Sequence, residues 1–255
     1  MRSAYSVAGE GPALFLIHGI GARRATFDRL VEGLSDRFTC ISYDLRGHGL
    51  SPLPQGRFGL DDLVDDLEEL RARLGIGQAH FAGHSLGGMI GPRYALRYPD
   101  RVLSLGLWST AAFRTEDDSA KVMGVVKLMR EKGIGPVLDT LTARWFTDAF
   151  CAARPDVIDW RKRQVMDTDA NVFLNVFDIY AETEMAPWLH QVKAPCQIIT
   201  GELDGGCNPR LNQLIHQALA GSELVILDKL KHAIFIEASE VVLPHVRQFL
   251  LAQGG

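Results

Sequence analysis

The sequence has few cysteines, no long apolar run and no strong excess of charge of either sign. Four cysteines are spread over 255 residues, at positions 40, 151, 196 and 207, and no C-x-x-C pair is present. Such sparse cysteines exclude a disulfide-stapled scaffold and do not indicate a structural zinc site. Cys40 and Cys196 lie within apolar runs, so we expect both to be small buried side chains.

The strongest apolar run spans residues 13–17, far short of the ~18 residues that suggest a membrane span. Residues 1–5 are followed by a stretch rich in glycine rather than by the apolar core of a secretory leader. The balance of 27 Lys+Arg against 31 Asp+Glu gives a net charge of −4, with no basic surplus to grip nucleic acid or anionic lipid. We therefore expect a cytoplasmic globular protein that has a small-molecule partner, binds neither nucleic acid nor membrane, and needs no metal or cofactor. Composition does not decide between a monomer and a homo-oligomer.

Runs of β-forming residues alternate with helix-length segments along most of the chain, which predicts β-α-β units and a mainly parallel sheet. Several runs are continuously apolar, as expected for strands that helices cover on both faces. With 47% hydrophobic residues, the chain can bury one large core. We expect strands at 13–17, 38–43, 79–82, 102–108, 196–200 and 224–227.

The segment 60–74 carries leucine and valine at helical spacing on one face and acids on the other, which predicts an amphipathic helix ending before Gly75. Its acidic run favours a solvated face that complements the helix dipole over a metal site. From 111 to 186 helical patterns and aromatic residues dominate, and no strand is evident. We therefore expect a helical cap at 111–186, inserted into a core domain made of residues 1–110 and 187–255.

The stretch AHFAGHSLGGMI at 79–90 predicts a strand, then G-x-S-x-G, then a helix. Ser85 would lie on a sharp strand-to-helix turn, where Gly83 and Gly87 remove side chains that would collide. The following helix directs N–H groups and the positive end of its dipole toward an anion formed beside the hydroxyl. This context predicts that Ser85 is a nucleophile.

A serine hydroxyl needs a base to take its proton and an acid to orient that base. In this architecture both follow the serine in the chain, acid first, in loops after later strands. Asp204 follows the strand at 196–200, with Glu202 as the alternative acid in the same loop. His232 follows the last strand, whereas the histidines at 190, 216 and 245 lie in the insertion or in helical patterns. We expect Asp204 and His232 to complete the catalytic set.

The segment LFLIHGIG at 14–21 predicts a strand that ends in a loop containing two glycines. Such a loop lets the main chain approach a reacting carbonyl, so the N–H groups of Ile20 and Leu86 would form an oxyanion hole. We expect His18 to hold this loop through its ring nitrogens rather than to transfer protons.

Five motifs occur in order: HGIG at 18–21, YDLRGHGLS at 43–51, GHSLGG at 83–88, GELDGG at 201–206 and KHAIFIE at 231–237. Together they closely resemble the α/β-hydrolase superfamily over nearly the whole chain. The resemblance implies an α/β-hydrolase fold with an inserted helical cap, and the triad roles given above. It also implies a structural role for the turn at 44–49, with Asp44 near the pocket as the alternative. Members usually begin with an antiparallel strand pair, for which residues 1–8 alone are available, so we expect the first edge strand to be absent or the sheet to start late.

The segment ARWFTDAF at 143–150 and the length of the cap resemble 3-oxoadipate enol-lactonases, whose substrate is a carboxylated lactone. This resemblance makes Arg144 a candidate to pair with a substrate carboxylate. The alternative is a surface arginine stacked on an aromatic ring. Trp145, Phe146 and Phe173 are candidates to shape a mostly apolar pocket, and the alternative is that they belong to the core.

The sequence therefore predicts a cofactor-independent serine hydrolase that cleaves a small ester or lactone through an acyl-enzyme on Ser85. A serine at the elbow, where other hydrolases carry aspartate, argues against dehalogenase-like or epoxide-hydrolase-like chemistry. Two alternatives stay open. One is a carbon–carbon bond hydrolase of a diketone that uses the same three residues, and the other is a non-catalytic ligand receptor on the same fold.

Overall fold

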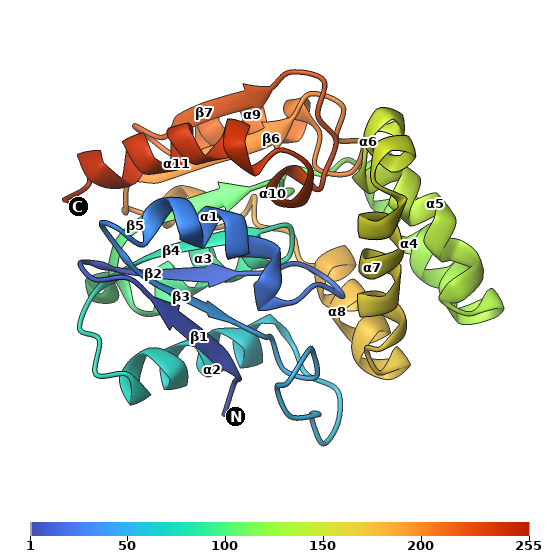
Figure 1. The fold of residues 1–255 in the computed structure, drawn as a ribbon, viewed down its shortest axis with the longest axis horizontal. Helices are drawn as coiled ribbons and strands as arrows, with labels where there is room; N and C mark the ends of the chain where they lie inside the picture. The colour runs from blue at the N-terminus through green and yellow to red at the C-terminus, as the bar shows by residue number, and fades with distance from the viewer. Residues whose placement is uncertain (1, 255) are drawn as a thin grey trace.

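A central sheet with helices on both faces forms the body of the protein in the computed structural model, which describes residues 2–254 (Figure 1). Within these residues the sheet has seven strands in the order β1-β3-β2-β4-β5-β6-β7, and β1 alone runs antiparallel to its neighbour. The strands are β1 (Tyr5–Ala8), β2 (Ala13–Ile17), β3 (Thr39–Tyr43), β4 (Ala79–His84), β5 (Val102–Trp108), β6 (Cys196–Gly201) and β7 (Glu223–Leu227). The predicted mainly parallel α/β sheet is confirmed.

The strands expected from apolar runs all form, but β1 was not among them. Tyr5 pairs with Tyr43 of β3, so residues at the start of the chain do form an antiparallel edge strand. Among the described residues this single antiparallel strand precedes β2 where the resemblance implies a pair, which agrees with the expectation that the first edge strand is absent or that the sheet starts late. The side chains of Tyr5 and Val7 are 40% and 49% exposed, so β1 lacks the continuous apolar run that marks the strands buried on both faces.

Side chains of β2 alternate between two hydrophobic clusters on opposite faces of the sheet. Phe15 and Ile17 belong to the larger cluster, and Leu14 and Leu16 belong to the smaller one. All four are fully buried. This two-sided burial explains why the run is apolar at every position rather than at every second one.

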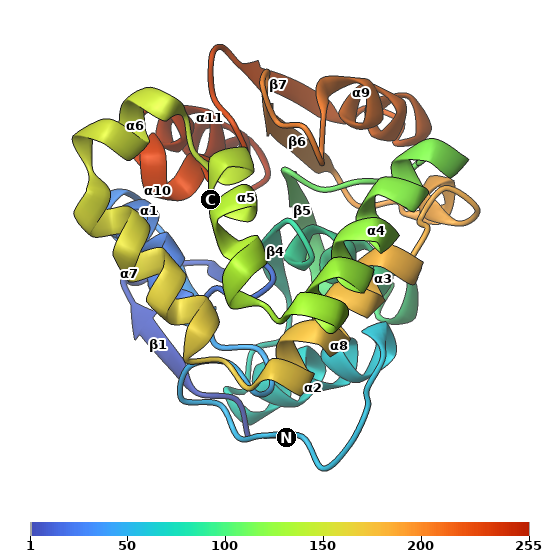
Figure 2. The ribbon, with the colours of Figure 1, turned by 90° about the vertical axis from the view of Figure 1, so that its right-hand side faces the viewer.

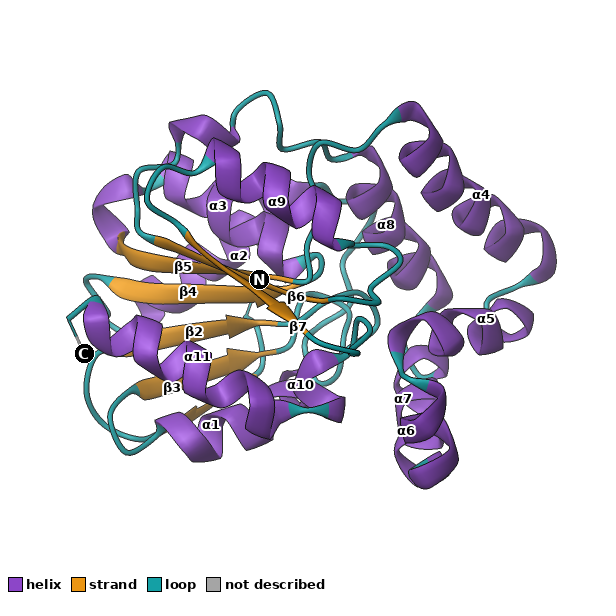
Figure 3. Cartoon of the chain, turned by 90° about the horizontal axis from the view of Figure 1, so that it is seen from above, coloured by secondary structure: helices purple, strands orange, loops and turns teal. Residues whose placement is uncertain are grey.

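Helices cover both faces of the sheet (Figure 3). On one face lie α2 (Leu60–Arg73), α3 (Gly87–Arg97) and α9 (Pro209–Ala218). On the other lie α1 (Asp28–Leu34), α10 (Ile234–Glu237) and α11 (Ser239–Ala252). In the described part of the chain, three short 3-10 helices span Arg24–Phe27, Pro99–Arg101 and Leu189–Gln191. The predicted helix at 60–74 is confirmed as α2, and Gly75 follows it with a φ of +69°.

Between β5 and β6 the chain forms five α-helices, which we call the α4–α8 layer: α4 (Glu116–Lys132), α5 (Gly135–Trp145), α6 (Asp148–Ala153), α7 (Pro155–Met166) and α8 (Ala170–Glu182). The layer lies beyond the carboxyl ends of the parallel strands (Figures 1 and 2). The division into a core and a cap at 111–186 stays a prediction. Across residues 2–254, no helix combines the length and apolarity needed to cross a membrane.

Hydrogen bonds tie the junction of α5 and α6 to the loop after β7 and to α10. The Ala233 N–H donates to the carbonyl of Trp145 at 2.8 Å, and Lys231 Nζ donates to the carbonyl of Ala143 at 2.9 Å. The Thr147 N–H donates to the Glu237 carboxylate at 3.1 Å. The α4–α8 layer is therefore joined to the loop that carries His232.

Candidate active site

Ser85 lies at the turn between β4 and α3 in the conformation that the sequence predicts. Its φ is +57°, a left-handed conformation that costs a residue other than glycine roughly 1–2 kcal/mol. Its N–H donates to the Trp108 carbonyl at 2.8 Å, and its carbonyl accepts from Thr110 Oγ1 at 2.9 Å. A Cβ on Gly83 would lie 2.0 Å from the carbonyl oxygen of Gly87, so this tight turn leaves no room for a side chain at position 83.

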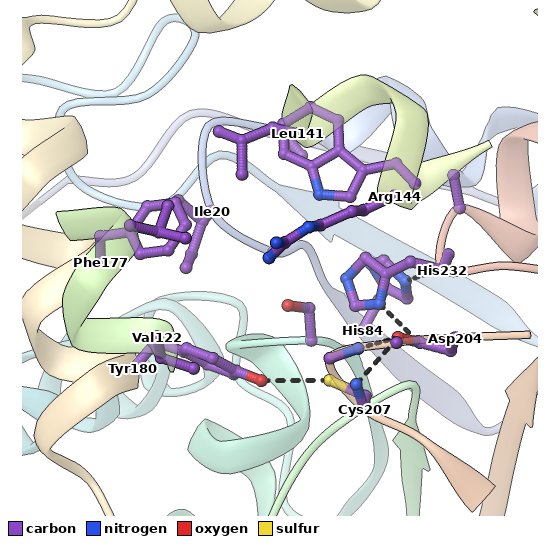
Figure 4. Close-up of a pocket in the computed structure, with 18 of the residues that line it drawn as sticks. Ile20, His84, Val122, Leu141, Arg144, Phe177, Tyr180, Asp204, Cys207 and His232 are labelled. Atoms are coloured by element: carbon purple, nitrogen blue, oxygen red, sulfur yellow. Dashed lines mark hydrogen bonds and ion pairs between the residues drawn. The ribbon is translucent and has the colours of Figure 1, made fainter. Parts of the chain in front are cut away.

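Asp204 and His232 form a hydrogen-bonded pair in the loops after β6 and β7. His232 Nδ1–H donates to Asp204 Oδ2 at 2.6 Å (Figure 4). The other Asp204 oxygen accepts the N–H groups of Gly206 and Cys207 at 2.9 and 2.8 Å. With Nδ1 committed to the carboxylate, Nε2 is the nitrogen left to accept a proton. Glu202, the alternative acid, is exposed and accepts the Lys229 N–H instead.

The electrostatics of this pair favour charge separation. Burial on its own lowers the pKa of His232, but the Asp204 carboxylate outweighs burial and raises it above the usual value. Burial likewise opposes ionisation of Asp204, and the charge and hydrogen bond of His232 together with the two backbone N–H groups lower its pKa. The aspartate is therefore held as a carboxylate that stabilises the protonated form of the histidine.

The loop after β2 lies directly against Ser85. A Cβ on Gly19 would be 2.9 Å from Ser85 Cβ, so glycine is required for this approach. Within residues 2–254, neither the Ile20 N–H nor the Leu86 N–H donates to a protein acceptor. Two unpaired backbone donors beside a candidate nucleophile are what an oxyanion hole requires.

Two buried histidines pin this loop and do not face the reacting centre. His18 Nδ1–H donates to the Gly19 carbonyl at 2.8 Å, and its Nε2 accepts the Leu45 N–H at 2.9 Å. His48 Nε2 accepts the Gly21 N–H at 3.2 Å. Burial lowers the pKa of both rings, that of His48 to about 4, so they act as neutral hydrogen-bonding groups. His18 thus contacts the loop through both ring nitrogens.

A cavity of about 390 Å³ opens at this end of the sheet (Figure 4). Ser85, Asp204 and His232 line it together with Ile20, and Arg144 and Trp145 contribute from α5. No hydrogen bond joins the Ser85 hydroxyl to His232 among residues 2–254. The nucleophile–base contact is commonly longer than a hydrogen bond before substrate binds, and it then tightens. Asp44 does not line the cavity but binds Arg24 and accepts the Leu50 N–H, as a structural residue would.

The structure does not bring Phe146 and Phe173 to the cavity wall. Both are fully buried, Phe146 stacked on Phe150 with 5.5 Å between ring centroids, and Phe173 against Phe177 at 5.6 Å. Their assignment to the pocket is corrected, because the inserted helices turn these rings into the core. The aromatic wall comes from Trp145 and from residues 177, 180 and 235.

Arg161 and Cys207 line the cavity without having been predicted to do so. Cys207 Sγ lies 3.2 Å from Tyr180 Oη. One ligand atom each from Asp204, Cys207 and His232 lies within 4.8 Å of the others, a donor set that suits a soft metal ion. The short hydrogen bond from His232 Nδ1–H to Asp204 Oδ2 nevertheless favours an acid–base pair over a metal site. Cys40 and Cys196 are buried, as expected.

Comparison with known proteins agrees with this geometry. A family model described as alpha/beta hydrolase fold matches residues 12–132. The 3-oxoadipate enol-lactonase 2 of Acinetobacter baylyi is 28% identical over 226 residues, which cover 88% of this chain and 84% of that protein. The solved structure of the enol-lactonase from Burkholderia xenovorans LB400 has a TM-score of 0.90 at 27% identity, covering 98% of this chain and 96% of its own.

A pimeloyl-[acyl-carrier protein] methyl ester esterase of Neisseria meningitidis serogroup A is 27% identical over 257 residues, covering 93% of this chain and 76% of that protein. The relatives thus include hydrolases of lactones and of esters. The sheet order, the strained serine turn and these matches show that the chain has the α/β-hydrolase fold and is similar to enol-lactonases and esterases.

Proposed function

We propose that this protein is a serine hydrolase of small carboxylic esters or lactones, with Ser85, His232 and Asp204 as its catalytic triad. The observation that carries this proposal is the convergence on one cavity of three features. These are the strained Ser85, the Asp204–His232 pair, and the unpaired N–H of Ile20. The unpaired Leu86 N–H directly follows Ser85 in the chain. We further propose that the α4–α8 layer is the cap that covers this centre.

In this mechanism His232 Nε2 takes the hydroxyl proton as Ser85 Oγ attacks the carbonyl carbon. The carbonyl oxygen becomes an oxyanion held by the N–H groups of Ile20 and Leu86. The alkoxide or enolate then leaves with the proton of His232, and an acyl-enzyme remains on Ser85. Water, deprotonated by His232, attacks the ester, and Ser85 departs with the proton. Each chemical role in this cycle is filled by the chain itself.

Arg144 gives the cavity a cationic group that suits a substrate with a free carboxylate. Its side chain extends across the cavity above His232 (Figure 4). It makes no ion pair or hydrogen bond with any residue among 2–254. A planar guanidinium binds a carboxylate through two parallel hydrogen bonds, so a free Arg144 favours a carboxylated ester or lactone.

The proposal predicts that a fluorophosphonate labels Ser85. The reagent mimics the tetrahedral intermediate, so it reacts with a serine that an adjacent base and an oxyanion hole activate. Peptide mass spectrometry should find one adduct, on residue 85. Ser85→Ala should abolish it, and the folded variant should no longer turn over p-nitrophenyl acetate.

A folded protein that gains no adduct, and that hydrolyses neither p-nitrophenyl acetate nor an enol-lactone, would instead be a ligand receptor. Comparing these two substrates with a vinylogous diketone separates ester and lactone hydrolysis from carbon–carbon bond hydrolysis. A strong preference for the diketone would contradict the proposed reaction.

Arg144→Met should raise KM for a carboxylated ester by about 10- to 100-fold, because one charge-assisted hydrogen-bonding group is lost. For p-nitrophenyl acetate, which carries no carboxylate, KM and kcat should stay within about twofold of wild type. Steady-state kinetics on both substrates measures the difference. The control is Arg154→Met, since Arg154 pairs with Asp156 outside the cavity wall. An equal KM change for both substrates would rule out this role for Arg144.

A further inference from the structure

Arg161 of α7 is a buried cation that is not paired with any carboxylate. Its residue surface is 6% exposed, and no ion pair to it is present within residues 2–254. Burial, followed by the nearby charge of Arg23, lowers the pKa of Arg161 to about 9, so it still carries its charge at neutral pH. Burying a charge that has no opposite charge beside it is unfavourable unless hydrogen bonds compensate for the lost hydration. Its partners therefore indicate what it does.

Those partners are the carbonyl groups of the loop that carries the Ile20 N–H. Arg161 Nη2 donates to the Ile20 carbonyl at 2.9 Å, and Nη1 donates to the Gly21 carbonyl at 2.6 Å. The guanidinium carbon also lies 4.6 Å from the centre of the Trp145 ring, which fixes the plane of the fork. A residue of the α4–α8 layer thus grips two consecutive peptide groups beside Ser85.

From the Gly19 carbonyl to the Ala22 N–H, almost every backbone polar group of the loop is paired. The Gly19 carbonyl accepts from His18 Nδ1–H and from the Ala22 N–H. The Gly21 N–H donates to His48, and Arg161 holds the two remaining carbonyls. In the described chain the exception is the Ile20 N–H, which has no acceptor. A trans peptide directs its N–H opposite its C=O, so the Ile20 N–H follows the Gly19 carbonyl, which His18 and the Ala22 N–H hold. Arg161 holds the next two peptide groups, on the other side of the Ile20 Cα, so both sides of this residue are fixed.

We propose that Arg161 is a positioning residue of the oxyanion hole, which holds the 19–21 loop from above so that the Ile20 N–H stays aimed at the reacting carbonyl. This inference rests on the proposed function, because it assigns Arg161 a role in the same reaction. It differs from the role proposed for Arg144, since Arg161 acts through the loop and does not bind the substrate carboxylate.

Arg161→Met should lower kcat by about 100-fold, near the effect of removing one oxyanion donor. The loss should be the same for p-nitrophenyl acetate and for a carboxylated ester, with KM within about threefold of wild type. The second-order rate of fluorophosphonate labelling should fall in parallel, because the phosphoryl oxygen occupies the same hole. Arg161→Lys keeps the charge but cannot fork onto both carbonyls, so its loss should be intermediate, about tenfold.

The control is Arg163→Met, an exposed arginine two residues along α7, which should leave kcat and KM unchanged. Each rate is divided by the concentration of active sites, which is the amount of enzyme that fluorophosphonate labels when the reaction has run to completion. Both measurements are made well below the midpoint of thermal unfolding, so that unfolded protein does not lower the apparent rate. Should Arg161→Met not fold, Arg161→Lys carries the test.

A normal kcat per titrated site in the folded variants would show that Arg161 serves stability alone and would overturn the inference. A rise in KM confined to the carboxylated ester would overturn it too, because Arg161 would then be a substrate ligand. Wild-type protein that neither turns over nor labels would count against the proposed function itself. An active wild type with active Arg161 variants would count against this inference alone.

Discussion

Asp204→Asn is expected to lower kcat by about 10⁴-fold. Asp204 Oδ2 accepts His232 Nδ1–H at 2.6 Å, so the carboxylate fixes which ring nitrogen is free to act as the base. The asparagine NH₂ group would favour the other tautomer, with the proton on Nε2, and the base would be blocked. The remaining oxygen can still accept the N–H groups of Gly206 and Cys207, so the loop should keep its shape.

The same substitution should change the pH profile in a defined direction. The histidine must be neutral to act as a base, so activity falls as pH drops through the pKa of His232. In the wild type Asp204 raises that pKa, and its removal should move the acidic limb of kcat/KM to lower pH by about one unit or more. Because the pKa of His232 is raised to about 10, hydrolysis of a small ester by wild type and variant is followed from about pH 5 to about pH 11, which spans both limbs.

Glu202→Gln is the matched control, since Glu202 lies in the same loop, is exposed and hydrogen-bonds Lys229. It should keep kcat within about twofold and leave the pH profile unchanged. If Glu202→Gln were the inactive variant, the acid of the triad would be misassigned.

Gly87→Ala is expected to destabilise the fold by about 3 kcal/mol or more, or to prevent folding. Its Cβ would lie 2.1 Å from the Ile17 carbonyl oxygen and 3.1 Å from that of His18. Both contacts are main-chain atoms, which cannot rotate away as a side chain can. In a protein of this size the loss corresponds to a fall in the unfolding midpoint of roughly 10 °C, measurable by circular dichroism.

Gly91→Ala, in the same helix α3, is the matched control. Its Cβ would meet Leu105 Cδ2 at 3.5 Å, an ordinary van der Waals contact. Alanine is also favoured over glycine within a helix by about 1 kcal/mol, so this variant should be as stable as wild type or more so. Similar effects from both substitutions would mean that helix propensity, and not the collision with β2, sets the cost at Gly87.

Sequence patterns predicted those parts of the fold that depend on local order along the chain. A strand buried on both faces is apolar at every position, which made β2 recognisable, and the strand–glycine–helix order identified the turn at Ser85. Asp204 and His232 could be chosen because acid and base follow the serine in loops after later strands. The short β1 escaped prediction, because three consecutive residues of this edge strand are exposed and neither of its faces carries a buried apolar pattern.

Residues of the α4–α8 layer were harder to assign, because their roles depend on which side of each helix faces the cavity. Phe146 and Phe173 were predicted to line the pocket but are core, whereas Phe177, one turn after Phe173 on α8, does line it. Arg161 resembles any basic residue of an amphipathic helix. Its contact with carbonyl groups about 140 residues earlier leaves no trace in local spacing.

The bonds between the α5–α6 junction and the region after β7 have a consequence for engineering. Lys231, Ala233 and Glu237 hydrogen-bond to residues at positions 143–147, so the segment at 231–237 and the α5–α6 junction depend on each other for these bonds. A chimera that received its helical layer from another hydrolase would leave these donors and the acceptor unmatched, next to the histidine that drives turnover. When the helical layer is replaced to alter the substrate range, residues 231–237 should therefore be replaced together with it.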